Sequence, residues 1–125
     1  MNVVDSSAWL EYFADGPNAS FFSRAIEHVD DLVVPSLTIY EVFKRVFQQR
    51  GEGDALRAIA VMQQGQVVDL DARIALAAAK ISLEAGLPLA DSIVLATTRA
   101  CGATLWTQDA DFQGMVGVQY RKRKA

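Results

Sequence analysis

Acidic side chains recur where the predicted strands of this sequence end and the following helices begin. Five residues occupy such positions: Asp5, Glu41, Asp91, Asp109 and Asp111. In a parallel α/β sheet, ligands bind outside the carboxyl ends of the strands, so we expect these side chains to converge. Carboxylates about 4 Å apart repel by up to ~4 kcal/mol at an effective dielectric constant near 20 unless protons or a cation relieve the repulsion. An all-oxygen cluster without nearby His or Cys favours Mg²⁺ or Mn²⁺.

Each of these residues also has a purely structural interpretation. Asp5 can be a helix cap or turn former, and Asp109 and Asp111 can be turn residues. On a helical wheel Glu41 lies opposite the apolar residues. It can therefore belong to a solvated helix face, where it forms an ion pair with Lys44 or Arg45. Asp91 stands among residues that favour burial, where a helix N-terminus stabilises it by roughly 0.3–1 kcal/mol.

Short Val- and Leu-rich runs alternate with longer helical segments along the chain. The expected strands are residues 2–4, 32–34, 66–70, 103–106 and 116–120. Six helical segments separate them, the first with Ser6 or Ser7 as its cap and the last covering residues 90–100. Strands that alternate with helices and lack polar alternation predict βαβ units. The expected fold class is α/β, a three-layer α/β/α domain with a mainly parallel central sheet.

The length and charge of the chain restrict its domain organisation and its possible partners. The 125 residues fit one domain spanning 1–125. Residues 121–124 form a basic tail, so the first 120 residues carry 8 basic and 15 acidic side chains. An acidic body disfavours nucleic-acid binding by bulk electrostatics, and a divalent metal would have to neutralise the carboxylates first. The single cysteine, the absence of a signal-peptide pattern and the absence of a long apolar run favour a cytoplasmic protein without a membrane segment.

The sequence lacks the residues that several classes of catalytic site require. The only histidine, His28, falls in the second predicted helix, away from any strand end, and is expected at the surface. This disfavours Ser–His–Asp and Cys–His hydrolysis. The glycine-rich loops of nucleotide-binding proteins are also missing.

Four segments in order resemble the motifs of PIN-domain proteins, and at this length the VapC-type toxins of toxin–antitoxin pairs. They are residues 3–11, 35–42, 87–96 and 105–112. The resemblance implies a PIN-like fold and a Mg²⁺- or Mn²⁺-dependent endoribonuclease that leaves 5′-phosphate and 3′-hydroxyl ends. It implies that an acidic quartet forms the site, made of Asp5, Glu41, Asp91 and Asp109. Thr107 corresponds to the family's hydroxyl residue near the metal, and Asp111 is a candidate for an outer carboxylate. It also implies a homodimer and a VapB-type antitoxin as partner.

On this hypothesis, Asp5, Asp91 and Asp109 hold the metal directly or through water, and Glu41 acts through water. Thr107 would orient the attacking water by hydrogen bonding. Lys44 and Arg45 can contact RNA phosphates, or can pair with Glu41 instead. The tail can contact RNA or serve only solubility.

Two other classes remain as alternatives. One is a catalytically inactive PIN-like binding module. The other is a phosphorelay receiver domain, which is disfavoured because Asp5 stands alone after the first strand and no lysine follows residues 105–106.

Overall fold

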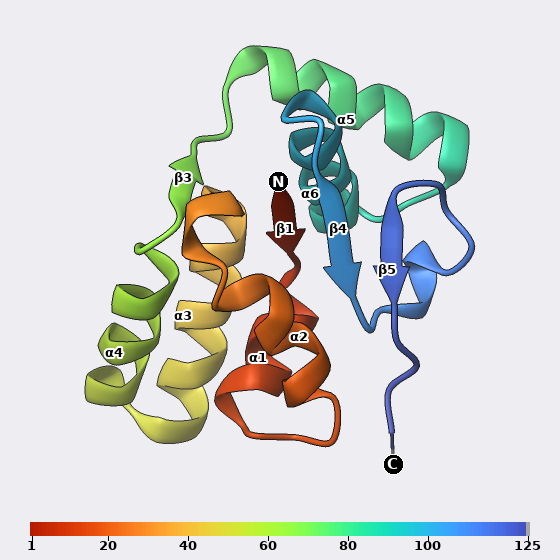
Figure 1. Cartoon of the computed structure of the whole chain (residues 1–125). Helices are drawn as coiled ribbons and strands as arrows, with labels where there is room; N and C mark the ends of the chain where they lie inside the picture. The colour runs from red at the N-terminus through yellow and green to blue at the C-terminus, as the bar shows by residue number, and fades with distance from the viewer. Residues whose placement is uncertain (125) are drawn as a thin grey trace.

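A computed structural model describes residues 1–124, which fold around a five-stranded parallel sheet (Figure 1). The strands follow one another across the sheet in the order β3-β2-β1-β4-β5, and all four pairings are parallel. Their bounds are β1 Asn2–Val4, β2 Leu32–Pro35, β3 Gln66–Val68, β4 Thr104–Thr107 and β5 Val118–Tyr120. This order differs from the 2-1-3-4-5 order of receiver-type folds, which argues against the phosphorelay alternative.

Six α-helices connect the strands in the described residues. They are α1 Ser6–Phe13, α2 Ala19–Ile26, α3 Ser36–Arg50, α4 Glu52–Met62, α5 Ala72–Ala85 and α6 Leu89–Ala100. Two short 3₁₀ turns, η1 Val29–Asp31 and η2 Ala110–Phe112, were not expected from the sequence. The predicted segments are confirmed as elements, although β3 and β5 are shorter than the expected runs 66–70 and 116–120.

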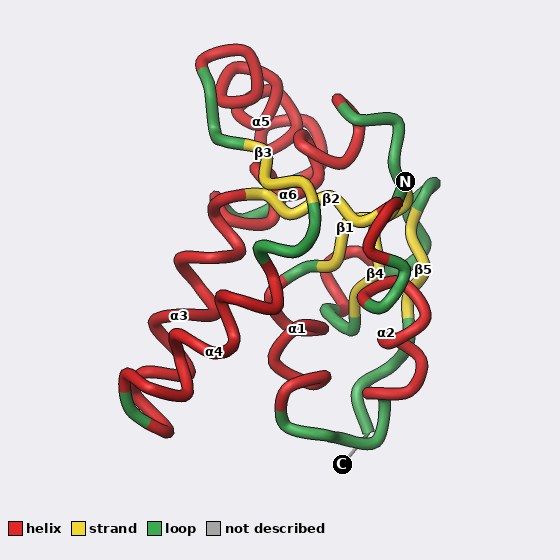
Figure 2. Tube along the Cα trace, turned by 60° about the vertical axis from the view of Figure 1, so that its left-hand side comes forward, coloured by secondary structure: helices red, strands yellow, loops and turns green. Residues whose placement is uncertain are grey.

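The sheet separates two hydrophobic cores, because successive strand residues point to opposite faces. On one face, Val4 and Val34 pack with Trp9 and Phe22 beneath α1 to α4. The other face carries a second core, in which Val3 lies among buried side chains of α5 and α6. Figure 2 shows the strands between these two helical layers. The expected three-layer α/β/α architecture is therefore confirmed.

Local chemistry explains where individual helices begin and end. Asp71 caps α5, and its Oδ1 accepts a hydrogen bond from the Ile74 backbone N–H at 2.9 Å. Gly86 ends the same helix with φ of 68°, a left-handed conformation that glycine adopts without strain. Gly53 lies inside α4, in the first turn of that helix.

No single helix among residues 1–124 is long and apolar enough to cross a membrane. The bent pair α5 and α6 passes that test only by joint length and composition, with a 117° bend between the two helices.

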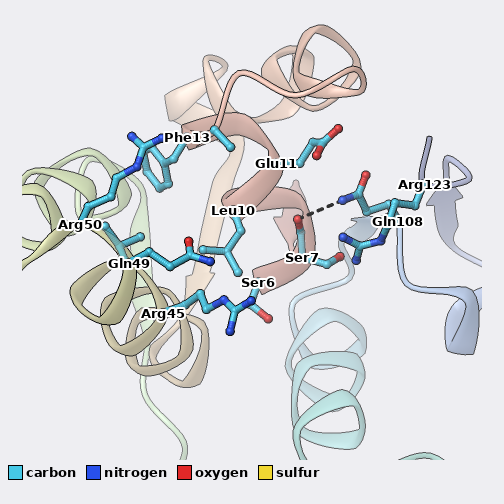
Figure 3. Close-up of a pocket in the computed structure, with 12 residues that line it drawn as sticks. Ser6, Ser7, Leu10, Glu11, Phe13, Arg45, Gln49, Arg50, Gln108 and Arg123 are labelled. Atoms are coloured by element: carbon cyan, nitrogen blue, oxygen red, sulfur yellow. Dashed lines mark hydrogen bonds between the residues drawn. The ribbon is translucent and has the colours of Figure 1, made fainter. Parts of the chain in front are cut away.

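A groove lies between α1 and α3, in the helical layer on the other side of the sheet from α5 and α6 (Figure 3).

Candidate metal centre

The sheet order brings the ends of β1 and β4 together at one edge of the domain. Val4 pairs with Trp106 in register, and the Asp5 backbone N–H donates to the Trp106 carbonyl at 3.1 Å. Asp5 thus lies beside Thr107, the last residue of β4. Asp109 follows two residues later at the start of η2. The first turn of α6 adds Asp91 at the same edge, as the strand-end rule predicts.

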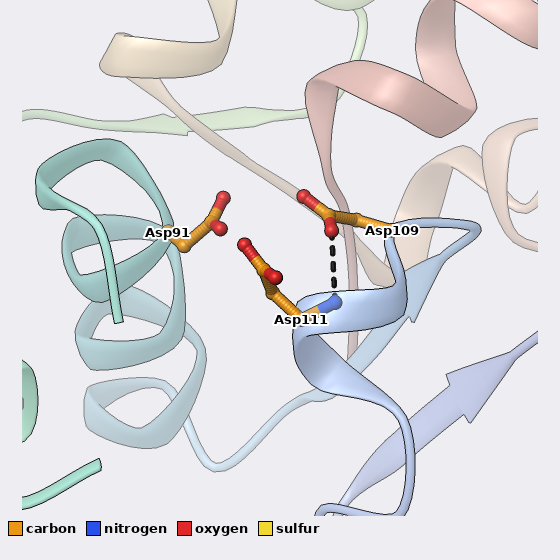
Figure 4. Close-up of side chains that lie close together, drawn as sticks. All are labelled: Asp91, Asp109 and Asp111. Carbon is orange, nitrogen blue, oxygen red and sulfur yellow. Dashed lines mark hydrogen bonds between the residues drawn. The ribbon is translucent and has the colours of Figure 1, made fainter. Parts of the chain in front are cut away.

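Three carboxylates form the tightest group at this edge: Asp91, Asp109 and Asp111 (Figure 4). One carboxylate oxygen from each lies within 4.8 Å of the other two. Asp109 caps η2, with its Oδ1 accepting from the Asp111 backbone N–H at 2.9 Å. This short turn carries both residues to the same side, where they face Asp91.

No cation of residues 1–124 neutralises this group. The ion pairs in this part of the chain, His28 with Asp31 and Arg57 with Asp54, lie elsewhere. His28 is exposed, as predicted, and takes no part in the site. Three unscreened carboxylates so close together require a proton or a cation.

The protonation of Asp91 reflects this crowding. The pKa of Asp91 is raised to about 7, first by burial and then by a hydrogen bond with Asp111. The negative charges of Asp109, Asp111 and Asp5 act in the same direction. Without a metal, Asp91 is therefore partly protonated at neutral pH. Because all the donors are carboxylate oxygens, the group fits Mg²⁺ or Mn²⁺ better than zinc.

Asp5 is deeply buried and outside the tightest group. Its side chain is only 4% exposed, and three hydrogen bonds fix it. Ser7 Oγ and the Ala8 backbone N–H donate to Oδ1 at 2.7 and 3.1 Å, and Thr107 Oγ1 donates to Oδ2 at 2.7 Å. Burial raises the pKa of Asp5 to about 6, although these hydrogen bonds lower it in part.

Asp5 is also the cap of α1, so the expectation that Ser6 or Ser7 caps this helix is wrong. The chain enters the helix directly from β1, which leaves Asp5 as the last extended residue. Ser7 instead turns back to donate to the Asp5 carboxylate. Such a carboxylate has about four acceptor positions, so one remains for a ligand.

Thr107 links two of the aspartates. Its hydroxyl is fully buried, donates to Asp5, and accepts from the Asp109 backbone N–H at 2.9 Å. Both hydrogen-bonding functions are thus engaged inside the protein. The geometry gives Thr107 a positioning role, and its expected contact with the attacking water stays a prediction.

Glu41 lies in α3, half-buried, and is not part of the tightest group. Burial raises the pKa of Glu41, and a hydrogen bond from Ser6 at the start of α1 lowers it in part. Within residues 1–124 it pairs with neither Lys44 nor Arg45. The Lys44 ammonium instead lies 5.7 Å from the Tyr40 ring centroid. Glu41 therefore lies near the acidic edge rather than on an ion-paired helix face.

Two polar residues near the site were not singled out from the sequence. Asn18 is 2% exposed, and its Nδ2 donates to Gln108 Oε1 at 3.0 Å. Gln108 Nε2 in turn approaches the Ser7 carbonyl at 3.5 Å. The sequence marks Asn18 only as a turn residue, because its partner lies 90 positions away. Trp9, Tyr12 and Phe13 form an aromatic cluster against the core.

Comparison with known proteins adds a family match. The PIN domain family model matches residues 3–117. No curated protein sequence matches the chain closely enough to add a relative.

Solved structures share the fold at low sequence identity. A toxin–antitoxin complex from Klebsiella pneumoniae has a chain 21% identical, with a TM-score of 0.82, covering 95% of this chain and 96% of that one. The sarcin-ricin loop cleaving toxin VapC20 of Mycobacterium tuberculosis is 17% identical, with a TM-score of 0.77 and coverage of 94% and 97%. VapBC2 of Rickettsia felis, bound to a promoter DNA fragment, is 10% identical, with a TM-score of 0.75 and coverage of 97% of each chain.

Proposed function

The chain belongs to the PIN-domain family, and on that premise we propose that it is a metal-dependent endoribonuclease acting as the toxin of a type II toxin–antitoxin pair. One observation carries the proposal: three carboxylates converge at the carboxyl edge of the sheet without a neutralising cation among residues 1–124. The repulsion among these carboxylates destabilises the metal-free protein, and a bound cation would relieve it. The similarity to VapC toxins supports RNA as the substrate.

Asp91, Asp109 and Asp111 would hold Mg²⁺ or Mn²⁺, with Asp5 able to offer its remaining acceptor position. A bound divalent cation lowers the pKa of a coordinated water and offsets charge on the attacked phosphate. Thr107 keeps Asp5 and Asp109 in fixed orientations through its two hydrogen bonds. Glu41, held at a distance by α3, would act through water.

Cleavage of total cellular RNA by the purified, antitoxin-free protein tests this proposal. Reactions would contain Mn²⁺, Mg²⁺ or EDTA, with 5′-end mapping of the products. Asp91→Asn would be compared with Asp69→Asn, a matched change at an exposed carboxylate outside the site. We expect metal-dependent cutting at discrete positions, lost in Asp91→Asn and retained in Asp69→Asn. Cutting that survives EDTA and Asp91→Asn would contradict the proposal. Metal binding without any cutting would favour the inactive binding module.

The proposal includes a VapB-type antitoxin and a homodimer. Several structural neighbours are VapBC complexes, which supports an antitoxin partner. On α5, Leu76 and Leu83 are 74% and 89% exposed and stand seven residues apart on one helix face. A second copy of the chain would cover these leucines. Light scattering should give a dimer mass for the wild type and a monomer mass for Leu83→Glu, and a monomeric wild type would refute the dimer.

A further inference from the structure

The basic C-terminal tail is docked onto the domain. The Arg121 backbone N–H donates to the Thr107 carbonyl at 3.0 Å, continuing the pairing of β5 with β4. The Lys122 carbonyl accepts from the buried Asn18 Nδ2 at 3.0 Å. The Arg121 guanidinium carbon lies 4.1 Å from the Phe21 ring centroid, a cation–π contact. These contacts give Arg123 a defined place beside the site.

Arg123 lines one wall of a groove of about 470 Å³ between the tail, α1 and α3 (Figure 3). Arg45 and Arg50 on α3 line the opposite wall, and Leu10 lies between the walls. Lys44, which the sequence grouped with Arg45, does not line this groove.

The groove is positively charged within an acidic protein. Its three arginines face a single acidic residue, Glu11, whose Oε2 already accepts from the Asn18 backbone N–H at 2.8 Å. Within residues 1–124, none of the three arginines forms an ion pair. The first 120 residues carry 8 basic side chains, Arg45 and Arg50 among them, and 15 acidic ones, so the grouping of arginines in this groove is local. The guanidinium group of arginine can donate two parallel hydrogen bonds to phosphate oxygens.

The groove is lined by residues next to the carboxylates in sequence, although the carboxylates themselves do not line it. Ser7 lines it and donates to Asp5, and Gln108 lines it and precedes Asp109. A polyanion lying in the groove would therefore reach the acidic edge with its negative charge already balanced. The ring of Phe13, which also lines the groove, offers an apolar surface for a ribose or base.

We propose that this groove binds the sugar–phosphate backbone of single-stranded RNA on one side of the cleaved bond, with Arg45, Arg50 and Arg123 contacting phosphates. The proposal rests on the proposed ribonuclease function and deepens it. The arginines are positioning residues, because they bind the substrate away from the reacting atoms.

Binding measured without catalysis tests this inference. A fluorescently labelled, mixed-sequence single-stranded RNA oligonucleotide would be titrated in EDTA, with anisotropy recorded over a series of salt concentrations. The variants are Arg45→Gln, Arg50→Gln and Arg123→Gln, singly and together. The matched control is Arg99→Gln, because Arg99 lines a separate pocket between α5 and α6 on the other layer. Thermal unfolding checks that each variant is folded.

Each phosphate contact to a single strand contributes about 0.7 to the slope of log affinity against log salt concentration. We expect each groove variant to bind more weakly with a slope shallower by about 0.7, and the triple variant by about 2. A fourfold rise in salt would then cost the wild type roughly twentyfold more affinity than the triple variant. Arg45→Lys, which keeps the charge, should retain the slope, and Arg99→Gln should match the wild type.

The inference would be overturned if all three groove variants bound RNA with the affinity and salt dependence of a wild type that cleaves RNA. The proposed ribonuclease function would then still stand. The groove would then be available to a protein segment. A wild type that neither binds nor cleaves RNA would overturn the proposed function, and the inference with it.

Discussion

Replacing Asp5 by Asn should stabilise the metal-free protein at high pH. Burial raises the pKa of Asp5 from 3.8 to about 6. Between these values the folded protein holds a proton that the unfolded chain has released, so stability falls as the pH rises. The loss approaches about 3 kcal/mol at pH 8, of which about 1 kcal/mol is already present at pH 4.5.

Asparagine removes this ionisation but cannot accept the Thr107 hydroxyl proton as the carboxylate does. That lost hydrogen bond costs about 1 kcal/mol. Asp5→Asn should therefore be nearly neutral at pH 4.5 and stabilising by about 2 kcal/mol at pH 8.

Urea unfolding in EDTA at the two pH values measures this difference, with the exposed Asp69→Asn as the control. The reasoning would be refuted if Asp5→Asn destabilised the protein equally at both pH values. That result would show that hydrogen bonding, and not burial, dominates the energetics of Asp5.

Three further changes have defined outcomes. Mn²⁺ at a hundredfold excess over its Kd should raise the Tm of the wild type by roughly 10 °C, and Asp91→Asn should remove most of this shift. Thr107→Val should cost about 2 kcal/mol of unfolding free energy at pH 8 and reduce RNA cleavage, because valine leaves Asp5 Oδ2 and the Asp109 backbone N–H without the partner that Thr107 gives them. Thr107→Ser keeps the hydroxyl and should retain both stability and cleavage. Gly86→Ala should destabilise by about 1 kcal/mol because φ is positive there, whereas Gly53→Ala inside α4 should stabilise by about 0.5 kcal/mol in urea unfolding.

Each of these can fail in a distinct way. An equal Mn²⁺ shift in Asp91→Asn would place the metal elsewhere. Full cleavage by Thr107→Val would show that the link between Asp5 and Asp109 is not needed. A neutral Gly86→Ala would mean that the end of α5 relaxes to a right-handed conformation.

The sequence predicted the layers and the acidic edge well, for a physical reason. Apolar runs without polar alternation belong to strands covered on both faces, and parallel strands bring their carboxyl ends to one edge. The positions of Asp5, Asp91 and Asp109 at that edge follow from this topology.

The finer geometry depends on contacts that sequence patterns do not carry. The short turn η2 brings Asp111 into the tightest group, and the pairing of β1 with β4 engages Asp5 in hydrogen bonds with Thr107. A helical wheel placed Glu41 on a solvated face, but the start of α1 lies against that part of α3. The tail is held by Asn18, which lies 104 positions away from Lys122.

The most direct test of the metal centre is an anomalous difference map from crystals of the protein soaked in Mn²⁺. The proposed mechanism predicts one or more peaks within bonding distance of carboxylate oxygens of Asp91, Asp109 or Asp111. It predicts no such peak in crystals of Asp91→Asn treated in the same way. A Mn²⁺ peak elsewhere on the molecule, with this edge empty at saturating metal, would contradict the claim that these carboxylates form the catalytic centre.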